Sequence, residues 1–345
     1  KNVVEMKKSK YIVLFSSLIL LLGTQMSCSD SYLEEKPMDK FSPENLLTSK
    51  KGFETVIYSL HNFARSGLFQ SNNEDVMNTG TDVACSGVTD GRFFNDYSLI
   101  LPEHATPKFY WNWAYQKMLK DANLIITRAE NPNVSWTEDE KNTIVAEAKF
   151  FRAYTYNILV NLFGGVPIVD KEELSPRFDY TRASRKEVLE FIQKDLEFAA
   201  QYLPIVTSDA SQDGRIFRAA ANHLLSEVYI SLGQETGDQL FYDKSIAAAT
   251  AVIDGSCGEY ALVKSRFGDT SRPGDYYSDL FWTNQQNRAS GNKEGIWVVQ
   301  FEYLTPGAEE ANNAQLRLWG PKIEDVTYPD GKKILVCDTV GRMQG

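Results

Sequence analysis

The amino-acid sequence predicts a mainly α protein, in which tetratricopeptide-like helical hairpins form a scaffold and a loop-rich region contains a few short strands. Three observations lead to this fold class. Apolar residues recur at helical spacing in several long segments. Two of these segments begin with a capping box. The stretches between and after them are rich in Gly, Asn, Asp and aromatic residues and show little periodicity, which is typical of loops.

The first helices are expected in residues 51–65 and 109–130, and the most clearly marked helix begins at Thr137. Thr137 and Glu140 fit a capping box, in which the Thr side chain accepts from the N3 amide and the Glu side chain reaches back. Apolar and small residues then follow at steps of four and three along one helix face: Ile144, Ala148, Phe151, Thr155, Ile158 and Leu162.

The stretch "LFGGVPIV" is expected to end this helix. Gly164 or Gly165 can adopt the left-handed C′ conformation without a Cβ clash, and Pro167 favours extended backbone at the residue before it. The two glycines do not open a helix, so they lack the geometry with which backbone amides hold a phosphate. The stretch is therefore predicted to be a structural corner rather than a ligand-binding loop.

A second capping box, at Ser184 and Glu187, begins the next helix, which is expected to end before Pro204. Two more helices are expected, in residues 215–233 and 241–255. This last pair loosely fits a tetratricopeptide unit through eight residues: Leu225, Ser226, Tyr229, Leu232, Gly233, Tyr242, Ser245 and Ile246. Alanines in both helices would allow close approach, so stacked helical hairpins are predicted.

Residues 295–303, "GIWVVQFEY", interrupt a long loop-like stretch and predict a strand. Trp297, Val299, Phe301 and Tyr303 alternate with the residues between them. Binding residues usually lie on long loops that a rigid scaffold positions, so the loops on both sides of this strand are the expected place for a ligand.

Composition and charge narrow the possible functions. The chain has 46 acidic and 36 basic residues and a net charge of −10, which makes it a poor candidate for binding nucleic acid. Its 19 Phe, 17 Tyr and 6 Trp suit a large core and also suit a protein that stacks on sugars. No nucleophile elbow, P-loop or dinucleotide fingerprint occurs, and no spacing selects two carboxylates as a glycosidase pair. Neither enzymatic activity nor a cofactor is expected.

The cysteines and histidines predict neither a metal site nor a disulfide framework. Apart from Cys28, they are scattered at long spacings: Cys85, Cys257, Cys337, His61, His104 and His223. The three later cysteines are expected to be buried free thiols. A disulfide bond between two of them is the alternative.

Residues 1–27 are predicted to be a signal peptide of the lipoprotein type. A basic segment precedes "YIVLFSSLILLL", an apolar run that is too short to span a bilayer but suits a signal peptide. Cys28 follows a small residue after this run, as in a bacterial lipobox, although Gln25 stands where the pattern prefers an aliphatic residue. Cys28 is the predicted lipidation site, and residues 28–50 the predicted tether. The alternative is plain secretion with an incidental cysteine.

Five segments resemble, in order, the SusD/RagB family of outer-membrane lipoproteins: "CSDSYLEEKP", "GFETVIYSLHNF", "YWNWAYQKMLKDANLII", "EAKFFRAYTYNILVNLFGGVPIV" and "EGIWVVQFEY". The most specific segment covers residues 147–168. Its matching positions are Glu147, Ala148, Phe151, Arg152, Ala153, Tyr154, Tyr156, Leu159, Phe163, Gly164, Gly165, Pro167 and Ile168.

The resemblance implies a SusD-like domain over residues 51–345 and a place on the cell surface, held in the outer membrane by a lipid anchor. It implies a binding protein that passes glycans, or peptides in the RagB branch, to a SusC-type TonB-dependent transporter. The expected scaffold comprises residues 51–65, 108–163 and 184–254, and the expected loop-rich binding region comprises residues 66–107 and 255–345. Family members usually continue further, so a C-terminal part is expected to be missing.

The family has no motif that fixes the ligand contacts, so aromatic and polar residues in loops are the predicted contacts. The shortlist is Arg92, Phe93, Asn95, Tyr303 and Trp319, each with the alternative that it packs its loop onto the core. Four other aromatic residues are expected in the core instead: Trp111, Trp113, Tyr115 and Trp282. A peptide binder, a glycoside hydrolase and a tetratricopeptide adaptor remain as alternative functions.

Overall fold

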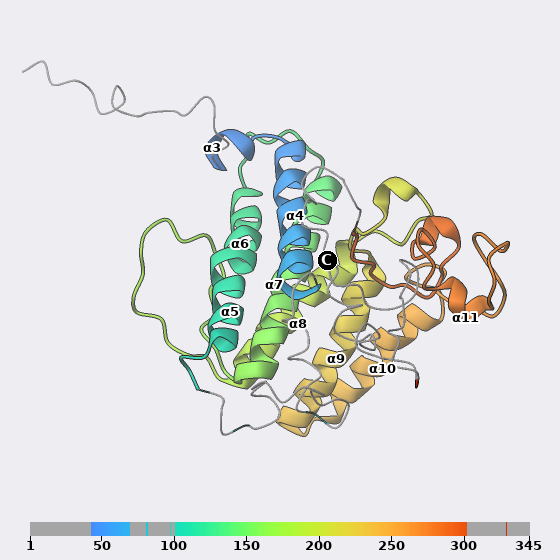
Figure 1. Cartoon of the computed structure of the whole chain (residues 1–345). Helices are drawn as coiled ribbons and strands as arrows, with labels where there is room; N and C mark the ends of the chain where they lie inside the picture. The colour runs from blue at the N-terminus through green and yellow to red at the C-terminus, as the bar shows by residue number, and fades with distance from the viewer. Residues whose placement is uncertain (1–42, 70–80, 82–96, 98–100, 302–328, 330–345) are drawn as a thin grey trace, which may run out of the picture. The chain divides into compact units, whose positions relative to one another are not determined.

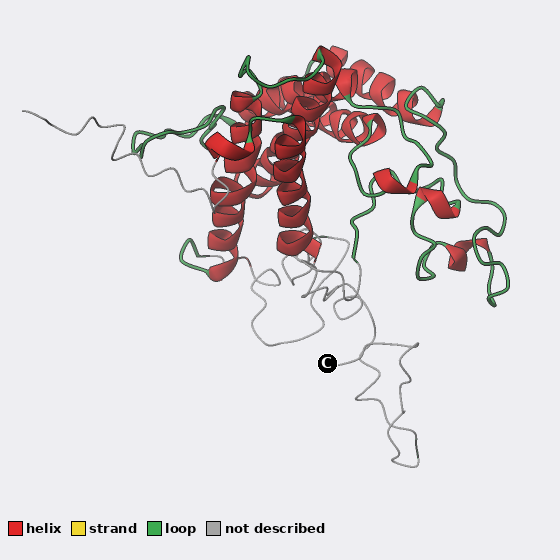
Figure 2. Ribbon diagram, turned by 90° about the horizontal axis from the view of Figure 1, so that it is seen from above, coloured by secondary structure: helices red, strands yellow, loops and turns green. Residues whose placement is uncertain are grey.

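The computed structural model describes residues 43–69, 81, 97, 101–301 and 329, and Figures 1 and 2 show them as helices joined by loops. The chain divides into two units, residues 1–46 and 47–345. In the first unit the described element is the short helix α3 (Pro43–Leu46). The remaining elements belong to the second unit and confirm the predicted mainly α class.

The second unit begins with α4 (Lys50–Ala64), whose N-cap Ser49 accepts from the amide of Gly52. A π-helical turn, η1 (Arg65–Phe69), continues it. The next continuous helical segment consists of α5 (Ala105–Trp113), the π-helical turn η5 (Ala114–Met118) and α6 (Leu119–Arg128). The helix predicted over residues 109–130 therefore begins earlier and contains a π-helical turn.

The long helix α7 (Glu138–Phe163) lies at the centre of the scaffold and packs against α4, α6 and α8 (Arg185–Tyr202) (Figure 1). The capping box predicted at its start is present. The amide of Glu140 donates to the Thr137 hydroxyl at 3.2 Å, and the amide of Thr137 donates to the Glu140 carboxylate at 2.9 Å. Ser184 and Glu187 form the second predicted box at the start of α8.

Helices α9 (Arg218–Thr236) and α10 (Gln239–Ile253) form the predicted tetratricopeptide-like hairpin. A Cβ added to Gly233 would lie 2.7 Å from the ring of Tyr242, so the small residue permits the contact between the helices. The hydroxyl of Ser245 donates to the carbonyl of Ser226 at 2.8 Å across the same interface. These residues belong to the pattern from which the hairpin was predicted.

Between α7 and α8 the chain makes the predicted structural corner at Gly164 and Gly165. Gly164 has φ 70° and ψ −132°, a positive-φ conformation outside the left-handed helical region that was predicted. A Cβ on Gly165 would lie 2.1 Å from the carbonyl oxygen of Ala183. Arg182 donates to the carbonyls of Phe163 and Gly165, both at 2.7 Å. The corner therefore needs glycine for backbone geometry and for space.

After α10 the chain forms loops with two short helices, α11 (Tyr276–Asp279) and η7 (Arg288–Ser290). The strand predicted from residue 295 is wrong for residues 295–301, and no strand occurs in the described part of the chain. A strand needs a ladder of backbone hydrogen bonds to a neighbour. Among residues 255–301, the backbone bond that joins this region to an earlier loop runs from the amide of Ala261 to the carbonyl of Lys293 at 3.2 Å. The apolar alternation instead reflects side-chain packing of Trp297.

Candidate functional site

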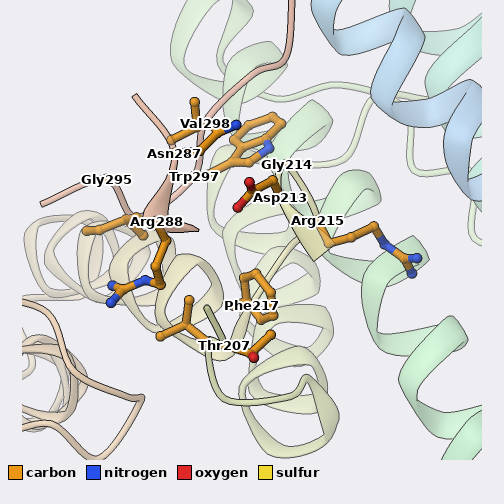
Figure 3. A pocket seen from close by; sticks show the side chains of 12 residues that line it. Thr207, Asp213, Gly214, Arg215, Phe217, Asn287, Arg288, Gly295, Trp297 and Val298 are labelled. Atoms are coloured by element: carbon orange, nitrogen blue, oxygen red, sulfur yellow. The ribbon is translucent and has the colours of Figure 1, made fainter. Parts of the chain in front are cut away.

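An open hollow lies where the loop between α8 and α9 meets the loop-rich segment after α10 (Figure 3). Residues 206–207, 213–215 and 217 line one side, and residues 287–288 and 295–298 line the other. The enclosed volume of about 30 Å³ holds one or two water molecules. An extended ligand could therefore lie across the hollow but would not be enclosed by it.

The hollow offers several polar groups. Thr207 and Asp213 lie on the α8–α9 side. Burial, and then the charge of Asp209, raise the pKa of the Asp213 carboxyl. On the opposite side, the side-chain amides of Asn287 and Gln300 bond each other in both directions, at 3.2 and 2.9 Å. The hollow thus combines hydroxyl, carboxyl and amide groups, which can bond a polar ligand without a metal.

Trp297 fixes the loop side of the hollow to the scaffold. Its ring makes edge-to-face contacts with four other rings at centroid distances between 5.5 and 6.4 Å: Phe69, Phe150, Phe151 and Tyr154. Such arrangements are favoured because the positive edge of one ring meets the negative face of another. Within the described residues the indole N–H of Trp297 is buried and has no acceptor.

Glu147 of α7 fixes the opposite side. This buried carboxylate accepts from Nε of Arg215 at 3.0 and 3.1 Å, from a second Arg215 nitrogen and from the amide of Ile216 at 3.4 Å. It also bonds Nε2 of His61 at 2.8 Å. Burial alone would raise the pKa of Glu147, but the His61 bond and the Arg215 charge outweigh it and lower the pKa to about 2. Figure 3 shows Arg215 pointing away from the hollow, consistent with this anchoring role.

A second buried network on α7 holds the corner and α8. Arg152 donates to both oxygens of Asp195, at 2.6 and 2.8 Å, to the carbonyl of Asp170 at 2.7 Å and to the side chain of Asn123 at 2.8 Å. Asn123 in turn donates to the carbonyl of Val169 at 2.9 Å. The segment that most resembles the SusD/RagB family is thus the one whose side chains join the other elements.

The predicted binding residues cannot be placed on this site. Arg92, Phe93, Asn95, Tyr303 and Trp319 all lie outside the described residues, as does Cys28, and they stay predictions.

Of the four aromatic residues predicted to be in the core, Trp113 is buried, whereas Trp111, Tyr115 and Trp282 are half-buried. The indole of Trp113 is buried and donates to the carbonyl of Phe63 at 2.9 Å. Tyr115 stacks on the half-buried Trp111, with ring centroids 5.0 Å apart, and donates to the carbonyl of Pro167 at 2.7 Å. Trp282 is half-buried and packs against the guanidinium of Arg272.

The sequence prediction missed the residues that line the hollow. Trp297 was assigned to a strand, and neither Thr207 nor Asp213 was singled out. The available signal was the Asp213-Gly214 pair, a turn dipeptide in the loop before a helix. Nothing in the spacing indicated that this turn meets residues more than 70 positions further along.

The described residues contain neither a metal-binding cluster nor a membrane-spanning helix. In residues 43–69 and 101–301, no group of three or more His, Cys, Asp or Glu side chains could hold a metal ion. No helix in the described part of the chain has the length and apolarity needed to cross a membrane. Cys257 is a buried free thiol whose pKa is raised by burial.

Sequence comparisons give the relatives of this chain. A family model described as "Starch-binding associating with outer membrane" matches residues 31–230. SusD-like protein P2 of Formosa agariphila is 26% identical over 305 residues, which cover 85% of this chain and 53% of the relative. A SusD-like protein of Bacteroides ovatus is 26% identical over 229 residues, covering 65% of this chain and 39% of the relative. The chain thus spans about half the length, or less, of these relatives.

Solved structures share the fold. A SusD homolog from Bacteroides thetaiotaomicron superposes with a TM-score of 0.63 at 21% identity, over 80% of this chain and 50% of that one. A crystal structure with a xylogluco-oligosaccharide superposes with a TM-score of 0.60 at 19% identity, over 76% of this chain and 49% of that one.

Proposed function

This chain belongs to the SusD-like family, because a family model matches residues 31–230 of its 345 residues, and we propose that it binds an oligo- or polysaccharide at the cell surface. The bound glycan is passed to a partner SusC-type TonB-dependent outer-membrane transporter. The observation that carries this proposal is the family match itself, whose description names starch binding and association with the outer membrane. The protein acts by binding and not by catalysis.

The hollow of Figure 3 is the proposed place of contact in the described residues. A sugar hydroxyl both donates and accepts hydrogen bonds, so it can bond the Thr207 hydroxyl, the Asp213 carboxylate and the Asn287 amide. The open shape suits a glycan chain that lies across the surface. Arg92, Phe93, Asn95, Tyr303 and Trp319 are proposed as further contacts from the neighbouring loops.

Lipidation of Cys28 is the proposed anchor in the outer membrane, with residues 28–50 as the tether to the fold. Such an anchor would keep the binding face at the cell surface beside the transporter. Labelling cells with a radioactive fatty acid tests this step. The protein is expected to incorporate the label and Cys28→Ala to lose it, whereas equal labelling of both would overturn the anchor.

Isothermal titration tests the binding function, using soluble starch, xylogluco-oligosaccharides and a set of peptides as ligands. We expect at least one carbohydrate to bind, and Asp213→Ala to weaken binding by about tenfold because it removes a charged acceptor. The matched control is Asp243→Ala, which removes an exposed carboxylate of α10 outside the hollow.

Three outcomes would contradict the proposal. Binding of peptides alone would assign the chain to the peptide-binding branch. Release of sugar products from starch or xyloglucan would make it a glycoside hydrolase. Co-purification with a soluble protein but not with an outer-membrane barrel would indicate a tetratricopeptide adaptor.

A further inference from the structure

Residues 265–285 form a loop that is closed by its own hydrogen bonds. The guanidinium of Arg266 donates to the Asp279 carboxylate at 2.6 Å and to the carbonyls of Gly274 and Arg272, both at 2.8 Å. A single side chain therefore ties together the start, the middle and the end of the loop.

A second buried side chain, Gln285, completes this closure. Its amide donates to the carbonyls of Phe267 and Asp279 at 3.2 and 3.3 Å, and its oxygen accepts from the amide of Asp269 at 3.1 Å. Asp275 and Ser278 form a capping box at the start of α11. Polar groups thus hold the loop from inside, independently of its aromatic rings.

Three aromatic residues on this closed loop face solvent. Tyr276, Tyr277 and Phe281 have exposed fractions of 46%, 63% and 66%. The rings of Tyr277 and Phe281 lie 5.2 Å apart with an interplanar angle of 64°. Apolar rings favour burial, so a rigid loop that presents three of them to water offers a prepared binding surface.

We propose that Tyr276, Tyr277 and Phe281 form a carbohydrate-stacking surface, here called the ring platform, which contacts the glycan of the proposed function at a place outside the hollow. This inference rests on the proposed function. The apolar C–H face of a sugar packs on a ring, and the two Tyr hydroxyls can bond sugar hydroxyls at the ring edges.

The charges of the loop favour a neutral sugar over an acidic one. Arg266 is fully engaged within the loop, and Arg272 pairs with Asp269 at 3.2 Å and lies over the Trp282 ring at 5.3 Å. The arginines in turn neutralise Asp279 and Asp269, and Asp275 accepts from the amide and hydroxyl of Ser278. Residues 265–285 therefore leave no unpaired arginine for an acidic glycan, whereas a neutral glycan needs only ring faces and hydrogen bonds.

Affinity electrophoresis in gels that contain soluble starch or xyloglucan tests the ring platform. The variant Tyr277→Ala/Phe281→Ala is compared with the unmodified chain, and Phe178→Ala is the control. Phe178 is 93% exposed in the α7–α8 loop, so its replacement removes an exposed ring elsewhere. We expect the platform variant to bind the retarding polysaccharide about tenfold more weakly, with an unchanged melting temperature and an unaffected control.

The outcomes separate the two proposals. If the platform variant binds as tightly as the unmodified chain while Asp213→Ala is weakened, the function stands and the ring platform is wrong. A clear fall in melting temperature for the platform variant would mean that the rings pack against protein, which also overturns the platform. If neither starch nor xyloglucan retards the unmodified chain, and titration finds no other glycan, the proposed function fails and the platform fails with it.

Discussion

The helical scaffold and the loop segment after α10 are held together in different ways. In the scaffold, the decisive bonds join residues far apart in sequence: Arg152 and Asp195 are 43 positions apart, and Arg215 and Glu147 are 68 apart. In the loop segment, Arg266 and Asp279 are 13 positions apart, and Gln285 bonds residues up to 18 positions away. The scaffold therefore forms only as a whole, whereas residues 265–285 close locally.

Trp297 packs the loop segment against the helical scaffold. It belongs to the loop segment, but its ring lies among rings from η1 and α7. We therefore expect substitutions in the scaffold to unfold both regions, and substitutions in the loop segment to leave the scaffold folded. Four substitutions test this difference, from the largest expected effect to the smallest.

Gly165→Val is expected to prevent stable folding, at more than about 4 kcal/mol, because its side chain would displace the backbone at Ala183. Circular dichroism during thermal unfolding measures this. The control is Gly164→Ala, where nothing lies within 4 Å and only the positive φ is strained, at about 1–3 kcal/mol. A stable Gly165→Val protein that fails only in glycan binding would show that the corner is a ligand site.

Arg152→Leu is expected to destabilise the protein by about 3 kcal/mol, because it removes the bidentate partner of the buried Asp195 carboxylate and leaves Lys149 as its remaining ion pair. Urea unfolding gives the free energy. The control is Arg185→Leu, which breaks a partly exposed pair with Glu235 and is expected to change stability by less than about 1 kcal/mol. Similar losses for the two variants would contradict the difference between buried and surface pairs.

Glu147→Gln is expected to remove a pH-dependent part of the stability, about 3 kcal/mol at neutral pH. The pKa of Glu147 is lowered from 4.5 to about 2, so the charged form stabilises the fold above pH 4.5. This contribution is lost as the pH falls from 4.5 towards 2. Urea unfolding between pH 2 and pH 7 should give a difference between the two proteins that shrinks as the pH is lowered.

The control for this pH series is Glu190→Gln, on the exposed side of α8 near Lys186. A difference between Glu147→Gln and the unmodified protein that stays constant with pH would mean that the Glu147 charge does not hold the α8–α9 loop.

Trp297→Ala is expected to have the smallest global effect and to open residues 295–301 locally, by about 2 kcal/mol, because four ring contacts are lost. Amide hydrogen exchange should become faster in this segment and stay unchanged in α7 and α8. The matched variant Trp282→Ala removes a ring that packs against Arg272 within the loop, and should leave residues 295–301 protected. Faster exchange throughout α7 would mean that the scaffold depends on the loop.

The fold could be predicted wherever a local pattern determines it. The capping boxes at Thr137 and Ser184 involve residues three positions apart, and the sequence therefore revealed both helix starts. Gly233 and Tyr242 lie within one hairpin, so a repeat pattern could find their contact. The strand prediction at Trp297 failed because its alternation is produced by packing against distant residues of η1 and α7 and not by a partner strand.

The candidate site was less predictable for the same reason. Asp213 and Trp297 meet through the tertiary fold, and no spacing rule connects them. The five contacts expected from loop composition, Arg92, Phe93, Asn95, Tyr303 and Trp319, still rest on that composition alone. Composition can indicate that a loop is suited to sugars, but it cannot give the geometry in which two loops meet.

The local closure of residues 265–285 also has an evolutionary consequence. Apart from bonds that Gln286 and Ser290 donate to two of its carbonyls, the hydrogen bonds that the structure describes for this segment end within it. Such a segment can be exchanged as a unit, because its replacement disturbs few contacts elsewhere. Recombination between related genes could thus alter the surface offered to a glycan while Trp297 and the helices are inherited unchanged. A chimera that carries this segment from a relative should fold with the stability of the parent and acquire the donor's preference among sugars.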